Sequence, residues 1–445
     1  MRLKTAMRGK AGVASSLAFI AILSAASCHR EQPSRRSSYV VTARPSRPAL
    51  PPLPDRPLPP ELEAERKEAM RRVAELRGLA WYADVPLTEL YAWEYGPRNS
   101  EMANYLGGDD LRALSRLASA GGMLPEGTDL ATLAASFAAI SAGANYSPLD
   151  KRVLLLANQP HGLSLLAHEY VHALQDQHFD LLRLLTARPY NFDRSEAIFA
   201  VIEGDALNVQ RRLEEGEAFM RRSLAEITRQ EDERLRSYRA EIGDLFPPLL
   251  TETFIFRYRD GARFVEELRR KKGQSVIDEL FRHPPTSSEQ ILHPEKYLAR
   301  EEPRAIELDT GTLTNGGWRL VTATPLGEIG IRGLLLSALA RPEAIQAAAG
   351  WGGDCAYLFA REDGAELFFW KTVWDSRRDA EEFYRAYNEL CRRKGELMAE
   401  RRDPSNRSFI WRIAGRLTWV KLEGDEVSIA RGNAAEVEDL MRDLL

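Results

Sequence analysis

GLSLLAHEYVHALQDQH, residues 162–178, is the stretch from which the fold of this chain can be argued. After Gly162 no glycine or proline interrupts it, and apolar residues recur at helix-like intervals. These residues are Leu165, Leu166, Val171 and Leu174. The spacing predicts a helix with one face packed against a core.

Within this helix, His168, Glu169 and His172 form the pattern H-E-x-x-H. Residues four apart lie on one face of a helix, so both imidazoles can reach one small ion. Glu169 projects to the side, where it can act on a water molecule instead of binding the ion. Two neutral histidines, an open position and a nearby carboxylate are typical of zinc hydrolases. The alternative is an ordinary helix with two surface histidines and a chance glutamate.

A third ligand is expected in the next helical segment, DRSEAIFAVIEGDALNVQRRL (193–213). Asp193 to Glu196 have the pattern of a capping box that opens this helix. Glu203 lies in its middle, with 30 residues between it and His172, among apolar neighbours. A carboxylate in that setting is costly unless a positive charge meets it, and a zinc ion would do so. The alternative is a solvent-facing glutamate on an amphipathic helix.

His178 competes with Glu203 for the role of third ligand. HEYVHALQDQH fits the frame of the metzincins, H-E-x-x-H-x-x-G-x-x-H, except that Gln175 stands where the chain needs a glycine to turn. If the helix continues, His178 is turned by about 600 degrees from His172 and faces away from the metal. We therefore predict the ligand set His168, His172 and Glu203.

The N-terminus has the features of a targeting segment. A basic start and an apolar Ser/Ala-rich run precede Cys28, which predicts a lipoprotein-type signal peptide over residues 1–27, with ordinary cleavage nearby as the alternative. Residues 28–60 are rich in proline, serine and arginine and are expected to be a disordered tether. The protein is thus expected to be exported and anchored to the cell envelope by lipid on Cys28.

Composition and pattern divide the remainder into two units. Residues 61–300 are mainly helical in pattern and contain six of the seven histidines; residues 301–445 alternate strand and helix patterns and contain none. We predict an α+β protein: a metallopeptidase-like helical domain, then an accessory domain with an antiparallel sheet. The apolar run 152–157 is expected to be a short strand whose edge holds the substrate, or else an ordinary buried strand.

Charge and cysteine content add two points. A formal net charge of -4 on 445 residues gives no reason to expect nucleic acid as a partner. If Cys28 carries lipid, Cys355 and Cys391 remain, and they either form a disulfide in an exported protein or stay as two buried thiols.

Several blocks resemble a known family. HEYVHALQDQHFDL, IEGDA, SSEQILHPEKYL and GWGGD are similar to segments of uncharacterised exported bacterial and archaeal proteins thought to be gluzincin-like zinc metallopeptidases. The resemblance implies a thermolysin-like site, with His168, His172 and Glu203 as zinc ligands and Glu169 as base. Thermolysin-like sites often carry an aspartate four residues after the ligand glutamate to orient a histidine. Here that position is Leu207, so Asp205 and Asp176 are the residues available for the role.

These inferences predict a membrane-tethered zinc endopeptidase that acts on peptides or proteins. Glu169 takes a proton from a zinc-activated water, which attacks the peptide carbonyl, and Glu169 passes the proton to the leaving amine. His293, in a Pro-rich loop, is the first candidate to stabilise the resulting oxyanion, with His283 and Tyr190 next. The rival prediction is a non-catalytic surface-binding lipoprotein that keeps zinc for structure.

Overall fold

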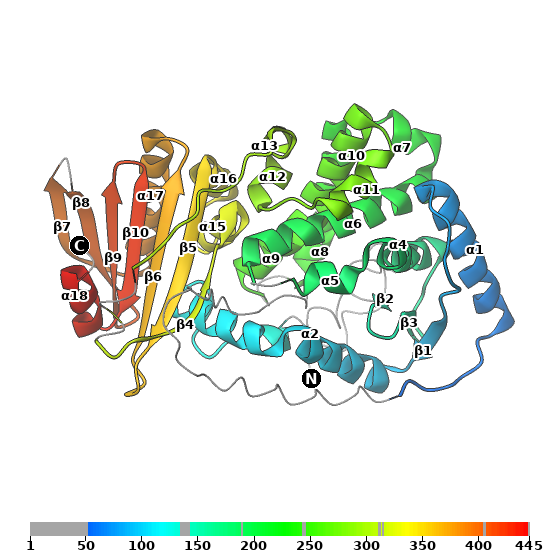
Figure 1. Ribbon diagram of the computed structural model, residues 1–445, viewed down its shortest axis with the longest axis horizontal. Coiled ribbons are helices and arrows are strands. Elements are labelled where there is room, and N and C mark those ends of the chain that lie inside the picture. Colours follow the sequence, from blue (N-terminus) through cyan, green and yellow to red (C-terminus); the bar gives the residue numbers. More distant parts are fainter. Residues whose placement is uncertain are drawn as a thin grey trace, which may run out of the picture.

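The structure, a computed structural model, describes residues 52–133, 143–187, 190–242, 246–309, 313, 316–403 and 406–443. The predicted signal peptide and Cys28 lie outside the described residues, as does most of the predicted tether. Residues 52–59 form neither helix nor strand and lead into the first helix, α1 (Pro60–Arg77). The predicted α+β class is confirmed: helices dominate the first part and an antiparallel sheet forms the last (Figure 1).

The helical part contains a small sheet that lies beside the predicted metal-binding helix. Its helices are α1, α2 (Ala92–Ala120), α4 (Leu163–Phe179), α5 (Leu181–Leu185), α6 (Phe192–Glu215), α7 (Glu217–Arg221), α8 (Leu224–Ile242), α9 (Pro248–Ile255), the π-helix η2 (Phe256–Asp260), α10 (Gly261–Lys272), α11 (Ser275–Arg282), α12 (Ser288–Leu292) and α13 (Pro294–Ala299). The strands are β1 (Leu87–Leu90), β2 (Ala144–Ser147) and β3 (Arg152–Leu156), in the order β1-β3-β2.

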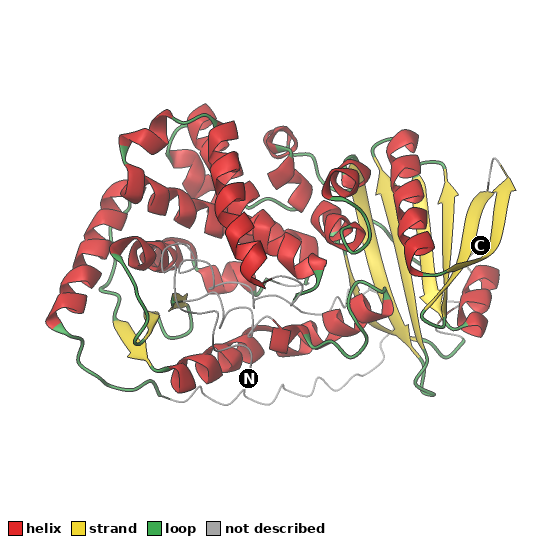
Figure 2. Cartoon of the chain, turned by 180° about the vertical axis from the view of Figure 1, so that it is seen from behind, coloured by secondary structure: helices red, strands yellow, loops and turns green. Residues whose placement is uncertain are grey.

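The C-terminal part is a seven-stranded sheet in the order β4-β5-β6-β10-β9-β8-β7, antiparallel throughout. Its strands are β4 (Arg319–Thr324), β5 (Trp351–Ala360), β6 (Glu366–Trp374), β7 (Glu396–Asp403), β8 (Asn406–Ile413), β9 (Arg416–Glu423) and β10 (Glu426–Gly432). The helices are α15 (Gly327–Leu335), α16 (Arg341–Ala348), α17 (Arg377–Lys394) and α18 (Ala434–Asp443). Figure 2 shows α17 lying across one face of this sheet, and α18 packs on β9 and β10.

The two cysteines that the structure describes form no disulfide with each other and lie on opposite faces of the large sheet. Cys391, on α17, is buried in the core that includes Trp370 and Ile429. Cys355, on β5, packs with Tyr357 and Phe359 on the other face. The disulfide that the sequence left open does not form here.

One hydrophobic core runs through both parts of the molecule. It includes Val171 and Phe199 from the helical part together with Ile329 and Trp370 from the C-terminal part. The predicted boundary at residue 300 falls between α13 and β4, where residues 301–309 form neither helix nor strand.

Ion pairs and buried hydrogen bonds hold the junction. The ammonium group of Lys296 lies 2.7 Å from carboxylate oxygens of Glu289, Glu301 and Asp375. The hydroxyl oxygen of Ser288 on α12 accepts a hydrogen bond from the backbone N–H of Ile329 on α15 at 3.2 Å. The block SSEQILHPEKYL thus joins the two parts of the chain, whereas Asp354 of GWGGD bonds the N–H groups of Leu326 and Gly327 within the C-terminal part.

The predicted strand over residues 152–157 is present as β3, and its position agrees with the alternative of an ordinary buried strand and not with a substrate-binding edge. β3 is the central strand, because β1 pairs with it in parallel and β2 pairs with it antiparallel. The strand next to α4 is β2, which has a neighbour on one side only among the described strands. The sequence did not predict β2, because residues 145–151 are rich in residues typical of turns.

The predicted capping box at the start of α6 was wrong. The N-cap is Asn191, whose side chain accepts a hydrogen bond from the N–H of Arg194. Asp193 is instead buried and accepts from the N–H of Ser288 at 3.0 Å. Glu196 forms a bidentate ion pair with Arg257, at 2.6 and 2.7 Å. Contacts with distant parts of the chain take both side chains away from the cap.

Candidate metal centre

Helices α4 and α6 bring the three predicted ligands together in the core. The Nε2 atom of His168 lies 3.2 Å from Oε2 of Glu203, and that of His172 lies 3.6 Å from the same oxygen. One donor atom from each of the three residues lies within 4.8 Å of the others. His168 and His172 are fully buried and Glu203 is 1% exposed.

These distances fit a tetrahedral zinc site. Bonds of about 2.0–2.1 Å to nitrogen and oxygen place neighbouring ligand atoms roughly 3.3 Å apart. The separations of 3.2 and 3.6 Å between the histidine nitrogens and Glu203 are close to that value. Two imidazoles and one carboxylate also leave the fourth position open, as in catalytic zinc sites.

Two glutamine side chains orient the histidines. The Nδ1 atom of His168 lies 3.1 Å from Oε1 of Gln210, and that of His172 lies 3.0 Å from Oε1 of Gln175. The amide oxygen accepts a hydrogen bond from the Nδ1–H group, which leaves the Nε2 lone pair directed at the centre. The orienting groups are therefore neutral amides, where the sequence pointed to carboxylates.

Asp205 and Asp176 take different parts in this arrangement. The amide nitrogen of Gln175 donates to Asp205 at 3.0 Å, and Asp205 pairs with the buried Arg77 at 2.8 Å. Asp205 therefore supports His172 through Gln175. Asp176 instead accepts from the hydroxyl of Tyr146 at 2.6 Å and does not contact the histidines directly.

Glu169 is fully buried beside the ligands. Its Oε2 accepts a hydrogen bond from the backbone N–H of Tyr146 on β2 at 2.8 Å. Its Oε1 has no hydrogen-bond partner in the part of the chain that the structure describes. Burial raises the pKa of Glu169 to about 8, with the charge of Glu203 adding to the rise and that of His172 opposing it. One carboxylate oxygen is thus held in place while the other is left to accept a proton.

Opposite charges couple His172 to Glu203. Burial alone would raise the pKa of Glu203, but His172 and His168 together lower it to about 2. Burial alone would lower the pKa of His172, but Glu203 and Glu169 raise it to about 9. The cluster therefore stabilises Glu203 as a carboxylate beside positively charged groups.

Tyr258 on η2 is a site residue that the sequence did not reveal. Its ring stacks on that of His168 with 6.3 Å between centroids, and it is 3% exposed. Burial first, and then the charges of Glu203 and Glu169, raise its pKa well above the usual value, so the hydroxyl keeps its proton. A π-turn often lies at a functional site, but no sequence pattern in FIFRYRDG (254–261) predicts the π-turn.

Two glycines allow η2 and α10 to approach α6 closely. A Cβ at Gly204 would lie 2.4 Å from the backbone of Gly261, and a Cβ at Gly261 would lie 2.2 Å from the carbonyl oxygen of Ala200. Gly204 directly follows the ligand Glu203. The block IEGDA therefore supplies a candidate ligand, Glu203, and the close contact between helices that places Tyr258 near it.

The other predicted residues lie outside the cluster. His293, the first candidate for the oxyanion, pairs with Glu328 on α15 at 3.1 Å, and its contacts do not reach the metal ligands. His178 bonds the carbonyl oxygen of Ala80 at 2.8 Å, so it faces away from the metal as expected. His283 is largely exposed, and Tyr190 lines a small cavity beside the Glu196–Arg257 pair.

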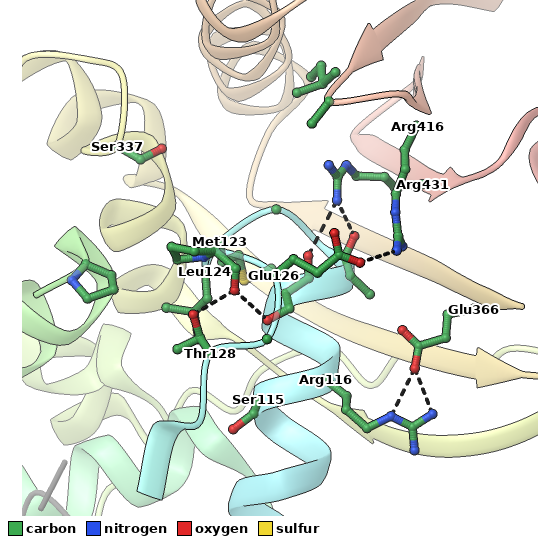
Figure 3. A pocket seen from close by; sticks show the side chains of 18 of the residues that line it. Ser115, Arg116, Met123, Leu124, Glu126, Thr128, Ser337, Glu366, Arg416 and Arg431 are labelled. Atoms are coloured by element: carbon green, nitrogen blue, oxygen red, sulfur yellow. Dashed lines mark hydrogen bonds and ion pairs between the residues drawn. The ribbon is translucent and has the colours of Figure 1, made fainter. Parts of the chain in front are cut away.

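A large cavity lies elsewhere, between the end of α2 and the large sheet (Figure 3). Its volume is about 1000 Å³, and it contains none of the cluster residues. Its charged groups already have partners: Arg116 pairs with Glu366 at 2.7 Å, and Arg431 donates to the carbonyl oxygen of Ala120 at 2.7 Å. Cations at helix carboxyl ends are stabilising in themselves, so these charges do not require a ligand.

Comparisons with known proteins bear on the C-terminal part. A family model described as a domain of unknown function (DUF8575) matches residues 318–442. The match begins just before β4 and ends within α18, so it covers the large sheet and its helices. No curated protein and no solved structure matches the chain.

Proposed function

We propose that this protein is a zinc-dependent peptidase. The observation that carries the proposal is the convergence of His168, His172 and Glu203 beside a buried Glu169 that has one oxygen without a partner. A buried polar atom without a partner costs free energy, so its presence beside a ligand cluster favours a catalytic role.

The residues would divide the work as follows. His168, His172 and Glu203 hold the ion, which when bound supplies a Lewis acid and lowers the pKa of water. Glu169 accepts a proton from the attacking water through Oε1 and passes it to the leaving amine, while the N–H of Tyr146 fixes its other oxygen. Tyr258, still protonated, takes the role first assigned to His293 and donates to the oxyanion.

The substrate in this proposal is an extended peptide on the edge of β2. The N–H of Leu156 donates to the carbonyl oxygen of Gly143, so residues 143 and 145 pair with β3. The backbone groups of residues 144 and 146 therefore point away from β3, which agrees with the hydrogen bond from Tyr146 to Glu169. A peptide that adds to this edge would lie beside the proton-accepting carboxylate.

Metal analysis and a peptide digest of the full chain test the proposal. The purified protein should contain about one zinc per chain and cleave peptides, and a chelator should abolish cleavage. Glu169→Gln should keep the zinc and lose cleavage by about a hundredfold or more. Glu203→Ala should release the zinc, whereas His178→Ala should retain it. A protein that holds no metal, or a Glu169→Gln variant that cleaves as well as the wild type, would refute the assignment.

A second candidate function is binding without catalysis, in which zinc only supports the fold. The side chains of His168, Glu169, His172 and Glu203 are at most 1% exposed, and this burial favours a zinc site that supports the fold. In this case Glu169→Gln would change neither zinc content nor any other property except stability. The loss of activity in that variant therefore separates the two candidates.

We also propose export and lipid anchoring, on the sequence of residues 1–28 alone. No helix of the described residues combines the length and apolarity needed to cross a bilayer. Mass spectrometry of the mature N-terminus should find lipid on Cys28, and Cys28→Ala should release the protein from membranes.

A further inference from the structure

Asn145 on β2 has a buried amide that nothing in the described protein satisfies. The side chain belongs to a residue that is 1% exposed, and neither Oδ1 nor Nδ2 has a hydrogen-bond partner. Asn388, a comparable buried asparagine, has both atoms bonded, to Tyr384 at 2.8 Å and to Trp411 at 2.8 Å. A buried amide without partners destabilises a fold, so its position calls for an explanation.

Asn145 is the chain neighbour of the residue that holds the proton-accepting carboxylate. It directly precedes Tyr146, whose N–H holds Glu169. Side chains alternate along a strand, and that of Tyr146 points to α4, where its hydroxyl bonds Asp176. The side chain of Asn145 therefore stands on the opposite face of the sheet, with that of its partner Leu154.

This geometry determines what part of a substrate the amide would meet. A peptide added to the edge of β2 would pair in the plane of the sheet with the backbone of residue 144 and the carbonyl of residue 146, because the N–H of Tyr146 already donates to Glu169. A side chain on the face of a sheet instead meets the side chain of the neighbouring strand, about 4.5–5.5 Å away between Cβ atoms. Asn145 would thus contact a substrate side chain and not the substrate backbone.

We infer that Asn145 selects substrates that carry an uncharged hydrogen-bonding side chain, an amide or a hydroxyl, at the subsite opposite it. The inference rests on the proposed function, because it takes β2 as the strand that binds the peptide. An amide offers both a donor and an acceptor, which matches such side chains. A charged group would have to lose its water in this buried position at a larger cost.

The experiment measures peptide binding separately from cleavage. Zinc-loaded Glu169→Gln, as full chain, is incubated with a randomised peptide library, and the retained peptides are sequenced. We expect at least a tenfold enrichment of Asn, Gln, Ser or Thr over Leu at one position. Adding Asn145→Leu should abolish this enrichment or turn it toward apolar residues, and should leave the other positions unchanged.

The Tm of thermal unfolding distinguishes a role of Asn145 in substrate selection from a role in stabilising the fold. Asn145→Leu removes two unsatisfied atoms, so its Tm should equal or exceed that of the parent protein. The matched control Asn388→Leu breaks two hydrogen bonds and should lower the Tm. A loss of Tm in Asn145→Leu as large as in the control would overturn the inference, because the asparagine would then be structural.

The remaining outcomes are distinct. An enrichment that survives Asn145→Leu, or a failure of the zinc-loaded protein to retain any peptide, would also overturn the inference. If the library shows the enrichment and Asn145→Leu removes it, but the wild-type protein cleaves nothing, then the selection by Asn145 stands and the peptidase proposal fails.

Discussion

At the scale of single residues, the proposed metal centre depends on side chains that are not themselves candidate ligands. Gln175 and Gln210 fix the histidine rings, and Asp205 supports one of them through Gln175. Gln175 stands where a metzincin would have its glycine, and the same residue that keeps α4 helical also orients His172. Side chains that hydrogen-bond to metal ligands are important for metal affinity, although they do not bind the metal themselves.

Gln175→Ala should therefore weaken zinc binding by about 10- to 100-fold, because His172 loses the acceptor that fixes its ring. Competition with a fluorescent chelator measures the affinity. The control is Gln177→Ala, since Gln177 lies on the same helix but bonds only the backbone of Tyr82 and Ala83. Equal zinc affinity in the two variants would contradict the role of Gln175.

Asp193 provides a prediction about pH. Burial, together with the charges of Asp354 and Glu289, raises its pKa to about 8, although hydrogen bonds from Ser288 oppose the rise. In the unfolded chain its pKa is about 4. The folded state thus binds more protons between these values, and its stability falls as the pH rises from about 4 to 8.

Asp193→Asn should remove this part of the pH dependence. An asparagine oxygen can still accept from the N–H of Ser288, but it does not ionise. The variant should gain stability relative to the wild type as the pH is raised, by more at pH 8 than at pH 5. Urea denaturation at the two pH values measures this, and parallel curves would show that Asp193 is ionised throughout.

At the scale of elements, the approach of η2 and α10 to α6 determines where Tyr258 lies. Gly261→Ala would place a methyl group against the carbonyl of Ala200, and the backbone cannot yield without moving η2. We expect a loss of about 1–3 kcal/mol in the free energy of unfolding. Guanidinium denaturation measures it, with Gly162→Ala as the control, because a Cβ there would meet no atom. A similar, small loss of unfolding free energy in both variants would mean that Gly261 does not pack tightly against Ala200.

The elements differ in how well the sequence predicted them. Helices α4 and α6 follow from local apolar spacing, and so does the placement of Glu203 beside the histidines. The position of β3 depends on β1, whose Leu87 pairs with Val153 from far along the chain, and no local pattern records that pairing. Tyr258 was missed for a similar reason, because it reaches the site through a π-turn and two glycines in separate segments.

At the scale of the whole molecule, the helical part and the large sheet share one core. Calorimetry of the full chain should therefore show one cooperative unfolding transition, not two, because neither part can lose its packing without exposing the other. Two well-separated transitions would indicate that the sheet, with its match to a domain of unknown function, folds as a separate unit.

The placement of the two thiols has a practical consequence. Cys355 and Cys391 lie on opposite faces of the large sheet, and burial raises the pKa of Cys391 to about 12, so that it is chemically inert. Oxidants cannot cross-link two groups separated by a layer of backbone. The folded chain should thus form no bridge between Cys355 and Cys391 in reducing or in oxidising surroundings, and mass spectrometry of protein prepared under both conditions should find no such bridge.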